Sequence, residues 1–156
     1  MIEVEFEYLS IDVKTNDFVI ILRRRDNGRQ LPIWIGSAEA FSIAIAMVGI
    51  EPPRPMTHDL LIDVVTALGA KLVRVVISGL RDSTFYALLH IERGDVETYV
   101  VDARPSDSIA LALRAKCDIV ISDDIETFNL EFPENETEKE LSERLRKVEP
   151  QEMIGF

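Results

Sequence analysis

The pattern that most constrains the fold of this chain occurs twice: three strand-like segments are followed by a helix-like segment. In strand-like segments such as residues 3–9, apolar side chains alternate with polar ones, which is typical of half-buried strands. The expected elements are strands at 3–9, 18–25 and 31–35 with a helix at 38–48, then strands at 71–78, 84–92 and 97–101 with a helix after Pro105.

The two occurrences align at a nearly constant offset. Phe18 falls on Phe85 at an offset of 67, and Glu39 falls on Asp107 at an offset of 68. A duplicated βββα unit accounts for this spacing. It predicts a single α+β domain, in which the two units form a mixed or antiparallel sheet packed with helices. A pseudo-twofold would then place Glu39 and Asp107 in equivalent positions.

A linker joins the two units, and a tail follows the second. The linker contains three prolines in residues 51–55 and then a helix at 58–68, with Thr57 as its expected cap. This helix has one apolar stripe, formed by Leu60, Leu61, Val64, Val65 and Leu68. After a short strand at 119–121, we place the end of the domain at 125. Residues 126–156 are then an acidic C-terminal extension with one helix at 136–148.

Charge and composition restrict the function classes. The net charge is -11, of which residues 123–156 carry -7, from eleven acids and four bases. A broad basic face for nucleic acid is therefore excluded, whereas a local basic patch in residues 1–122 is compatible with their charge of -4. The apolar runs are shorter than the roughly 20 residues of a membrane span, and the N-terminus has no basic leader. We expect no membrane association and a cytoplasmic location.

The turn before the second repeated helix concentrates charged and polar residues: Asp102, Arg104, Ser106 and Asp107. A helix start has unpaired N–H groups and a positive partial charge, so it attracts carboxylates and phosphates. One interpretation is phosphodiester cleavage, with Asp102 and Asp107 holding a divalent metal, Mg²⁺ or Mn²⁺, and Arg104 contacting phosphate. The alternative is structural: Ser106 and Asp107 cap the helix, while Arg104 ties the turn to Asp102.

A second candidate group surrounds one of the two histidines. His58 is suited to carry protons, Asp59 is a further acid for the catalytic group, and Arg54 is a second phosphate ligand. Helix-start residues that would support the site are Glu39, Thr57 and Ser106. The structural alternative makes His58 a first-turn residue oriented by its neighbours. His90, Trp34 and Tyr86 are expected to pack in strands, and the single cysteine, Cys117, is expected to be a buried thiol.

Several motifs in order resemble the bifunctional nuclease domain family, from about the N-terminus to residue 125. They are Leu-Pro-Ile-Trp-Ile-Gly at 31–36, Arg-Pro-Met-Thr-His-Asp at 54–59, Thr-Phe-Tyr-Ala at 84–87 and Asp-Ala-Arg-Pro-Ser-Asp at 102–107. The resemblance implies an α+β domain that associates with itself and acts as a nuclease on RNA and DNA. It identifies the domain rather than its catalytic residues.

Three hypotheses about function follow. The first is a metal-assisted nuclease with a nucleic acid substrate. The second is a non-enzymatic module for oligomer assembly or regulation, and the third is a domain that binds a small molecule in a groove at the pseudo-twofold. In each case we expect a homo-oligomer, most simply a dimer, because a sheet protein with 47% apolar residues leaves surface to cover.

Overall fold

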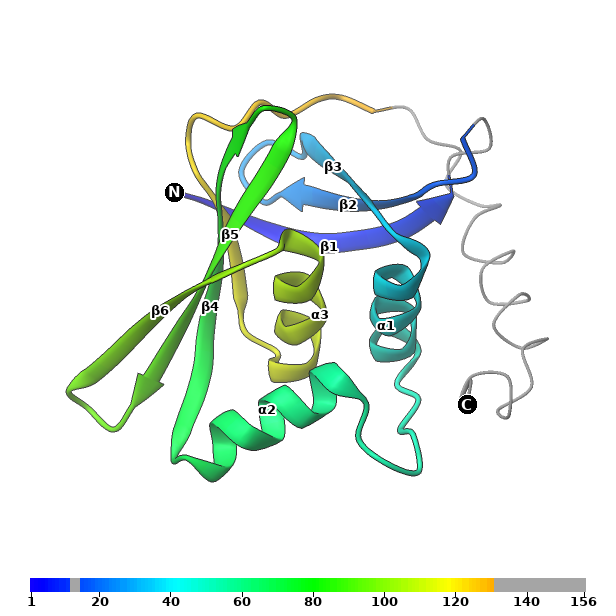
Figure 1. The fold of residues 1–156 in the computed structure, drawn as a ribbon. Coiled ribbons are helices and arrows are strands. Elements are labelled where there is room, and N and C mark those ends of the chain that lie inside the picture. The colour runs from blue at the N-terminus through cyan, green and yellow to red at the C-terminus, as the bar shows by residue number, and fades with distance from the viewer. Residues whose placement is uncertain (12–14, 131–156) are drawn as a thin grey trace.

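A seven-stranded sheet with three helices makes up the part of the chain that the computed structural model describes, residues 1–11 and 15–130 (Figure 1). The elements in order are β1 (Ile2–Ile11), β2 (Phe18–Arg24), β3 (Gln30–Ile35), α1 (Ser37–Val48), α2 (Thr57–Ala67), β4 (Ala70–Arg81), β5 (Thr84–Arg93), β6 (Glu97–Ala103), α3 (Pro105–Ala115) and β7 (Asp118–Ile121). The predicted α+β class is confirmed. The helix predicted at 136–148 lies outside the described residues.

The strand order places the last strand in the middle of the sheet: β3-β2-β1-β7-β4-β5-β6. β7 pairs antiparallel with β1 and parallel with β4, and the other neighbours are antiparallel. β1 and β4 therefore run in opposite directions, and each begins a three-stranded meander that leads into a helix. α2 and β7 have no counterparts in the first meander, so the internal duplication stays a prediction.

Tight turns connect the strands of each meander. Between β2 and β3, Gly28 adopts a positive φ of 74°. The side chain of Asn27 accepts a hydrogen bond from the Arg29 N–H at 3.0 Å. Between β4 and β5 the turn has positive φ at both Asp82 and Ser83, which is the conformation that matches the twist of paired strands. These turns fix the register on which the two faces of the sheet depend.

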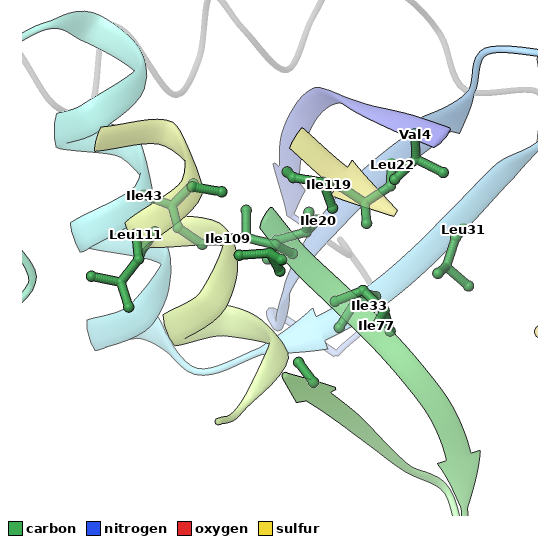
Figure 2. Packing of buried hydrophobic residues seen from close by; sticks show 14 of the residues in the cluster. Val4, Ile20, Leu22, Leu31, Ile33, Ile43, Ile77, Ile109, Leu111 and Ile119 are labelled. Atoms are coloured by element: carbon green, nitrogen blue, oxygen red, sulfur yellow. The ribbon is translucent and has the colours of Figure 1, made fainter. Parts of the chain in front are cut away.

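The core lies between the sheet and the two helices α1 and α3 (Figure 2). Small side chains, including Ala40 and Ala44 on α1 and Ala110 and Ala112 on α3, are buried among larger ones from the sheet. Alanine lets packed elements approach closely, so the starts of α1 and α3 come near each other. The larger residues in the cluster include Ile20, Leu22, Leu31, Ile33, Ile43, Ile77, Ile109 and Leu111.

Helix α2 is attached differently from the other two helices. It has no buried residue, although Ile62 packs against the core cluster. Its apolar stripe is exposed: Leu60 by 54%, Leu61 by 42%, Val64 by 46% and Leu68 by 65%. An apolar stripe on a helix usually faces the core. Here the polar residues at the start of α2 are the ones that face the other helices.

Candidate functional site

The start of α3 carries an ion pair between its N-cap residue and its first turn. Arg104 is the N-cap, Pro105 is the first helical residue and Asp107 lies in the first turn. The guanidinium of Arg104 donates from Nε to Asp107 Oδ2 at 2.8 Å and from Nη2 to Oδ1 at 3.2 Å. Both carboxylate oxygens of Asp107 are thus bound by one planar fork. The predicted pairing of Arg104 with Asp102 is wrong, because the three-residue spacing on the helix favours Asp107 instead.

The same arginine reaches the start of α1. Arg104 Nη1 donates to Glu39 Oε1 at 2.9 Å, across 65 residues of sequence. A Cβ on Gly36, the N-cap of α1, would stand 2.5 Å from Glu39 Oε2, so glycine leaves the room that this carboxylate occupies. The Arg104 side chain is 65% exposed, against 21% for Glu39 and 29% for Asp107. A solvent-facing cation therefore covers two less accessible acids.

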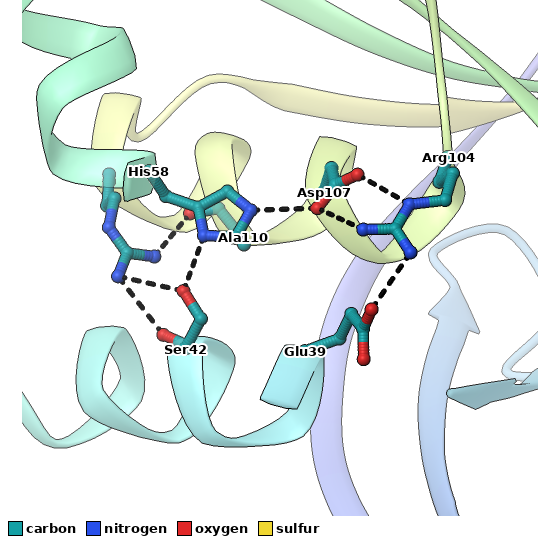
Figure 3. Close-up of polar contacts among 7 residues, drawn as sticks. Glu39, Ser42, His58, Arg104, Asp107 and Ala110 are labelled. Atoms are coloured by element: carbon teal, nitrogen blue, oxygen red, sulfur yellow. Dashed lines mark hydrogen bonds and ion pairs between the residues drawn. The ribbon is translucent and has the colours of Figure 1, made fainter. Parts of the chain in front are cut away.

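The imidazole of His58 connects α2 to both other helices (Figure 3). Its Nε2 lies 2.9 Å from Asp107 Oδ1, and its Nδ1 lies 2.7 Å from Ser42 Oγ on α1. The His58 side chain is 16% exposed, and Ser42 is buried. The serine, the histidine and the aspartate thus form a continuous hydrogen-bonded row that ends at the Arg104 fork.

Arg114, in the last turn of α3, closes the other end of this network. It donates from Nε to Asp59 Oδ1 at 2.6 Å and from Nη2 to Ser42 Oγ at 3.2 Å. Asp59 Oδ2 also accepts the backbone N–H of Met56 at 2.9 Å, which makes Asp59 the side chain that caps α2. Asp59 thus lies on the far side of Ser42 from the Arg104 fork. In this arrangement Asp59 caps the N-terminus of α2.

The hydrogen bonds assign the proton on His58. Because Ser42 Oγ accepts from Arg114, its own hydrogen is available for His58 Nδ1. The carboxylate of Asp107 can only accept, so Nε2 carries a proton and donates it to Asp107. Ser42 Oγ can give its hydrogen to Nδ1 or accept one from it, so the neutral ring and the imidazolium both satisfy the partners in this row.

The charges around Asp107 favour its ionised form. Burial acts to raise the pKa of Asp107, but the hydrogen bonds from Arg104 and then from His58 outweigh it and hold the pKa below its ordinary value. Asp107 in turn raises the pKa of Arg104, with a smaller contribution from Glu39. Asp107 is therefore a carboxylate, and Arg104 a cation, throughout the neutral pH range.

Comparison with known proteins agrees with the motifs in the chain. The model of the bifunctional nuclease domain matches residues 20–128. The chain belongs to the bifunctional nuclease domain family. Two proteins of Mycobacterium tuberculosis are similar to it, "Uncharacterized protein MT1877" of strain CDC 1551 / Oshkosh and "Uncharacterized protein Rv1829" of strain ATCC 25618 / H37Rv. Each is 44% identical over 121 residues, which cover 78% of this chain and 71% of the relative.

The bifunctional nuclease domain contains every residue of the network, but the predicted metal ligand Asp102 and the predicted phosphate ligand Arg54 lie apart from it. Asp102 pairs with Leu88 on β5, whereas its neighbours Val101 and Ala103 pair with the core residues Leu89 and Ala87. Since side chains alternate along a strand, the Asp102 carboxylate points to the face of the sheet away from the helices. Arg54 is exposed in the loop before α2, and neither side chain has a hydrogen bond or ion pair with any described residue.

The two predicted hydroxyl caps are not caps in this bifunctional nuclease domain. Met56 is the N-cap of α2, and Thr57 is already the first helical residue. Ser106 is the second residue of α3 and is buried, while Arg104 occupies the capping position without a side-chain cap. Proline at 105 explains why Ser106 is not the cap: its fixed φ suits the first helical position, so the N-cap is Arg104, two residues before Ser106.

The acids of this bifunctional nuclease domain do not fit a divalent metal as they lie. Across residues 1–11 and 15–130, no group of three or more His, Cys, Asp or Glu side chains comes together in a way that would hold an ion. Asp102 and Asp107 project to different sides of the sheet, and Arg104 occupies both oxygens of Asp107. No reaction step is therefore derived through Mg²⁺ or Mn²⁺.

Sequence reasoning missed two members of the network, Ser42 and Arg114. Ser42 lies within an apolar helix, and a serine there has no local signal for its partner. From the sequence alone, Arg114 in the last turn of α3 is expected to interact with the helix dipole rather than with another helix. Their positions on facing helices bring them together.

In the part of the family domain that the structure describes, no helix has the length and apolar character needed to cross a membrane.

Proposed function

We propose that this protein is a nuclease that hydrolyses phosphodiester bonds in RNA or DNA, and that His58, Asp107 and Arg104 form its site. The observation that carries the proposal is the 2.9 Å contact between His58 Nε2 and Asp107 Oδ1, directly beneath an exposed arginine. Membership of the bifunctional nuclease domain family supports the nuclease class.

Arg104 is the phosphate-binding residue in this proposal. A guanidinium has five N–H donors, and three of them are used by Asp107 and Glu39. One N–H on each Nη atom remains for a phosphate oxygen on the solvent side. The two carboxylates keep the planar group in place, so little side-chain entropy is lost when a substrate binds.

His58 is the proton carrier. In hydrolysis a water attacks phosphorus, the bond to the leaving oxygen breaks, and that oxygen takes up a proton. The donor is the imidazolium form of His58, whose Nε2 proton faces Asp107 and Arg104. This proton passes to the leaving oxygen and leaves the ring neutral. The attacking water releases a proton in the same reaction, which returns the ring to its starting state. Asp107 and Ser42 position the imidazole from its two nitrogens.

The test is cleavage of labelled single-stranded RNA and DNA by purified protein, with His58→Gln as the variant and His90→Gln as its matched control. His90 is the other histidine and lies on β5, opposite Val100. Removing a general acid or base typically costs about 10²–10⁴-fold in rate, and we expect a loss in that range for His58→Gln alone. Parallel assays with Mg²⁺, Mn²⁺ or EDTA measure any dependence on metal. Equal cleavage by the wild type and a folded His58→Gln variant would exclude this site.

One observation favours a second candidate function, a non-enzymatic module for assembly or regulation. Apart from the exposed Arg104, the polar side chains of the network are buried or half-buried. Their hydrogen bonds form one connected series that links α1, α2 and α3. In this second candidate function the network is structural, and its hydrogen bonds stabilise the packing of the three helices. In that case no cleavage would be seen with wild-type protein, and His58→Gln would lower stability alone.

A further inference from the structure

The two edges of the sheet are protected very differently. On the β3 edge, Pro32 cannot donate to a further strand. Gln30 is already paired with Phe128, through hydrogen bonds of 2.7 and 2.8 Å between their backbones. On the β6 edge, by contrast, no strand of residues 1–11 or 15–130 pairs with the outer side. Of the two edge strands in the described part of the chain, β6 is the one whose row of backbone donors and acceptors is neither interrupted by proline nor partly paired.

The residues of β6 do not discourage pairing. Exposed sheet edges are commonly blocked by proline, lysine or a bulge, and the sequence Glu-Thr-Tyr-Val-Val-Asp-Ala at 97–103 has none of these. Tyr99 is 44% exposed, Val100 55% and Val101 44%, so apolar side chains are uncovered on both faces of this strand. The β5–β6 hairpin also projects away from the helices, at the lower left of Figure 1. A bare apolar edge of this kind favours addition of a strand.

We propose that β6 pairs antiparallel with β6 of a second copy of this chain, about a twofold axis through Val100. The two sheets then join into one continuous sheet, with the helices of both copies on the same face. This register places Val100 opposite Val100, Tyr99 opposite Val101 and Thr98 opposite Asp102 of the other copy. All seven residues of the strand are paired.

Charge and polarity select this register among those that a twofold allows. A twofold axis perpendicular to two antiparallel strands passes through a residue, so alternative registers differ by a shift of the axis to a neighbouring residue. With the axis at Tyr99, Glu97 would face Val101 and Thr98 would face Val100. With the axis at Val101, Asp102 would face Val100. Only the axis at Val100 sets apolar residues against apolar ones and Asp102 against a hydroxyl.

The charged ends of the strand are compatible with the same register. Glu97 accepts hydrogen bonds from Arg93 Nε at 2.6 Å and from the Tyr99 hydroxyl at 2.7 Å within its own chain. It therefore needs no partner from the second copy, where Ala103 lies opposite. Asp102, which has no partner among the described residues, gains the Thr98 hydroxyl. The dimer thus gives this carboxylate a role away from the helix starts.

The first test is the mass of the full chain in solution by sedimentation at micromolar concentration. We expect a dimer for the wild type and a monomer for Val100→Lys, which would place two ammonium groups opposite each other. The matched control is Leu60→Lys on α2, because Leu60 is 54% exposed and Val100 is 55% exposed. It should remain a dimer. A monomeric wild type, a dimeric Val100→Lys, or dissociation by Leu60→Lys alone would overturn the proposal.

A second test does not depend on the folding of Val100→Lys. Thr98→Lys should tighten the dimer several-fold, because it creates two cross-strand pairs of opposite charge with Asp102, one on each side of the axis. Adding Asp102→Lys to that variant should abolish the gain, since lysine would then face lysine. Within one chain residues 98 and 102 are four strand positions, or roughly 13 Å, apart, so they do not interact directly. If Thr98→Lys did not tighten the dimer, or if the added Asp102→Lys substitution did not reverse the gain, the proposed register would be refuted.

Discussion

Helices α2 and α3 have the same length and both carry an aspartate in the first turn, but they are held by different forces. α3 has seven buried residues and α2 has none. α3 follows β6 directly and leads into the central strand β7, so the sheet fixes both of its ends. α2 is joined to α1 and α3 by His58 and Asp59 at its start. The difference shows that topology, rather than apolar content, decides which helix is buried.

The largest effect should come from truncating the apolar face of α3. Ile109 is fully buried, and Ile109→Ala removes methyl groups and leaves a cavity in the core. We expect the free energy of unfolding to fall by about 2–5 kcal/mol. On α2, Leu61→Ala should change it by no more than about 0.5 kcal/mol. Urea denaturation of both variants measures the contrast, and similar losses would show that the stripe on α2 is covered after all.

An intermediate effect should come from removing the cation that anchors α2. Arg114→Met leaves the carboxylate of Asp59 and the hydroxyl of Ser42 without their shared donor, which should cost about 1–3 kcal/mol. Hydrogen exchange should accelerate first at residues 57–67. Arg54→Met is the control, because the Arg54 side chain is exposed and has no described partner. Unchanged exchange in α2 of the Arg114→Met variant would mean that apolar contacts hold the helix.

The smallest effect concerns pH. The pKa values of Asp59 and Asp107 lie below their ordinary value, because hydrogen bonds from Arg114 and from Arg104 with His58 outweigh burial. Each carboxylate therefore adds stability that is complete above the unfolded pKa of 3.8 and is lost as the pH falls through the lower folded-state value. The urea concentration at the midpoint of unfolding should decrease once the pH falls below about 4. Asp107→Asn should make the unfolding midpoint depend less steeply on pH. An unchanged dependence would show that Asp107 does not contribute to the loss of stability in acid.

Local patterns in the sequence predicted the elements well. Alternation located the strands, glycine and asparagine located the turns, and the proline at 105 marked the start of α3 within one residue. These signals succeed because turns and strand faces depend on neighbouring residues. The α+β class followed from the order of the elements. The place of β7 in the middle of the sheet did not follow, because strand order depends on pairings between distant segments.

The candidate site was predictable only in part. The pairing of Arg104 with Asp107 could have been inferred from their spacing of three on a helix. The contacts of His58 with Ser42 and with Asp107 span 16 and 49 residues, and they arise from how α2 lies across α1 and α3. The position of Asp102 was misjudged because proximity in sequence says little when one residue ends a strand and the other begins a helix. Strand alternation directs that carboxylate to the opposite face.

The central position of β7 has a consequence for how the chain acquires its structure during synthesis. Both meanders consist of neighbouring strands, and they can form as soon as each has left the ribosome. Their joining must wait, because β1 and β4 do not pair with each other and the strand between them, Asp118–Ile121, is the last of the strands to be made. Until then the nascent chain holds two separate half-sheets with uncovered edges. Closure requires contacts over more than a hundred residues, so we expect it to be the slow step of folding.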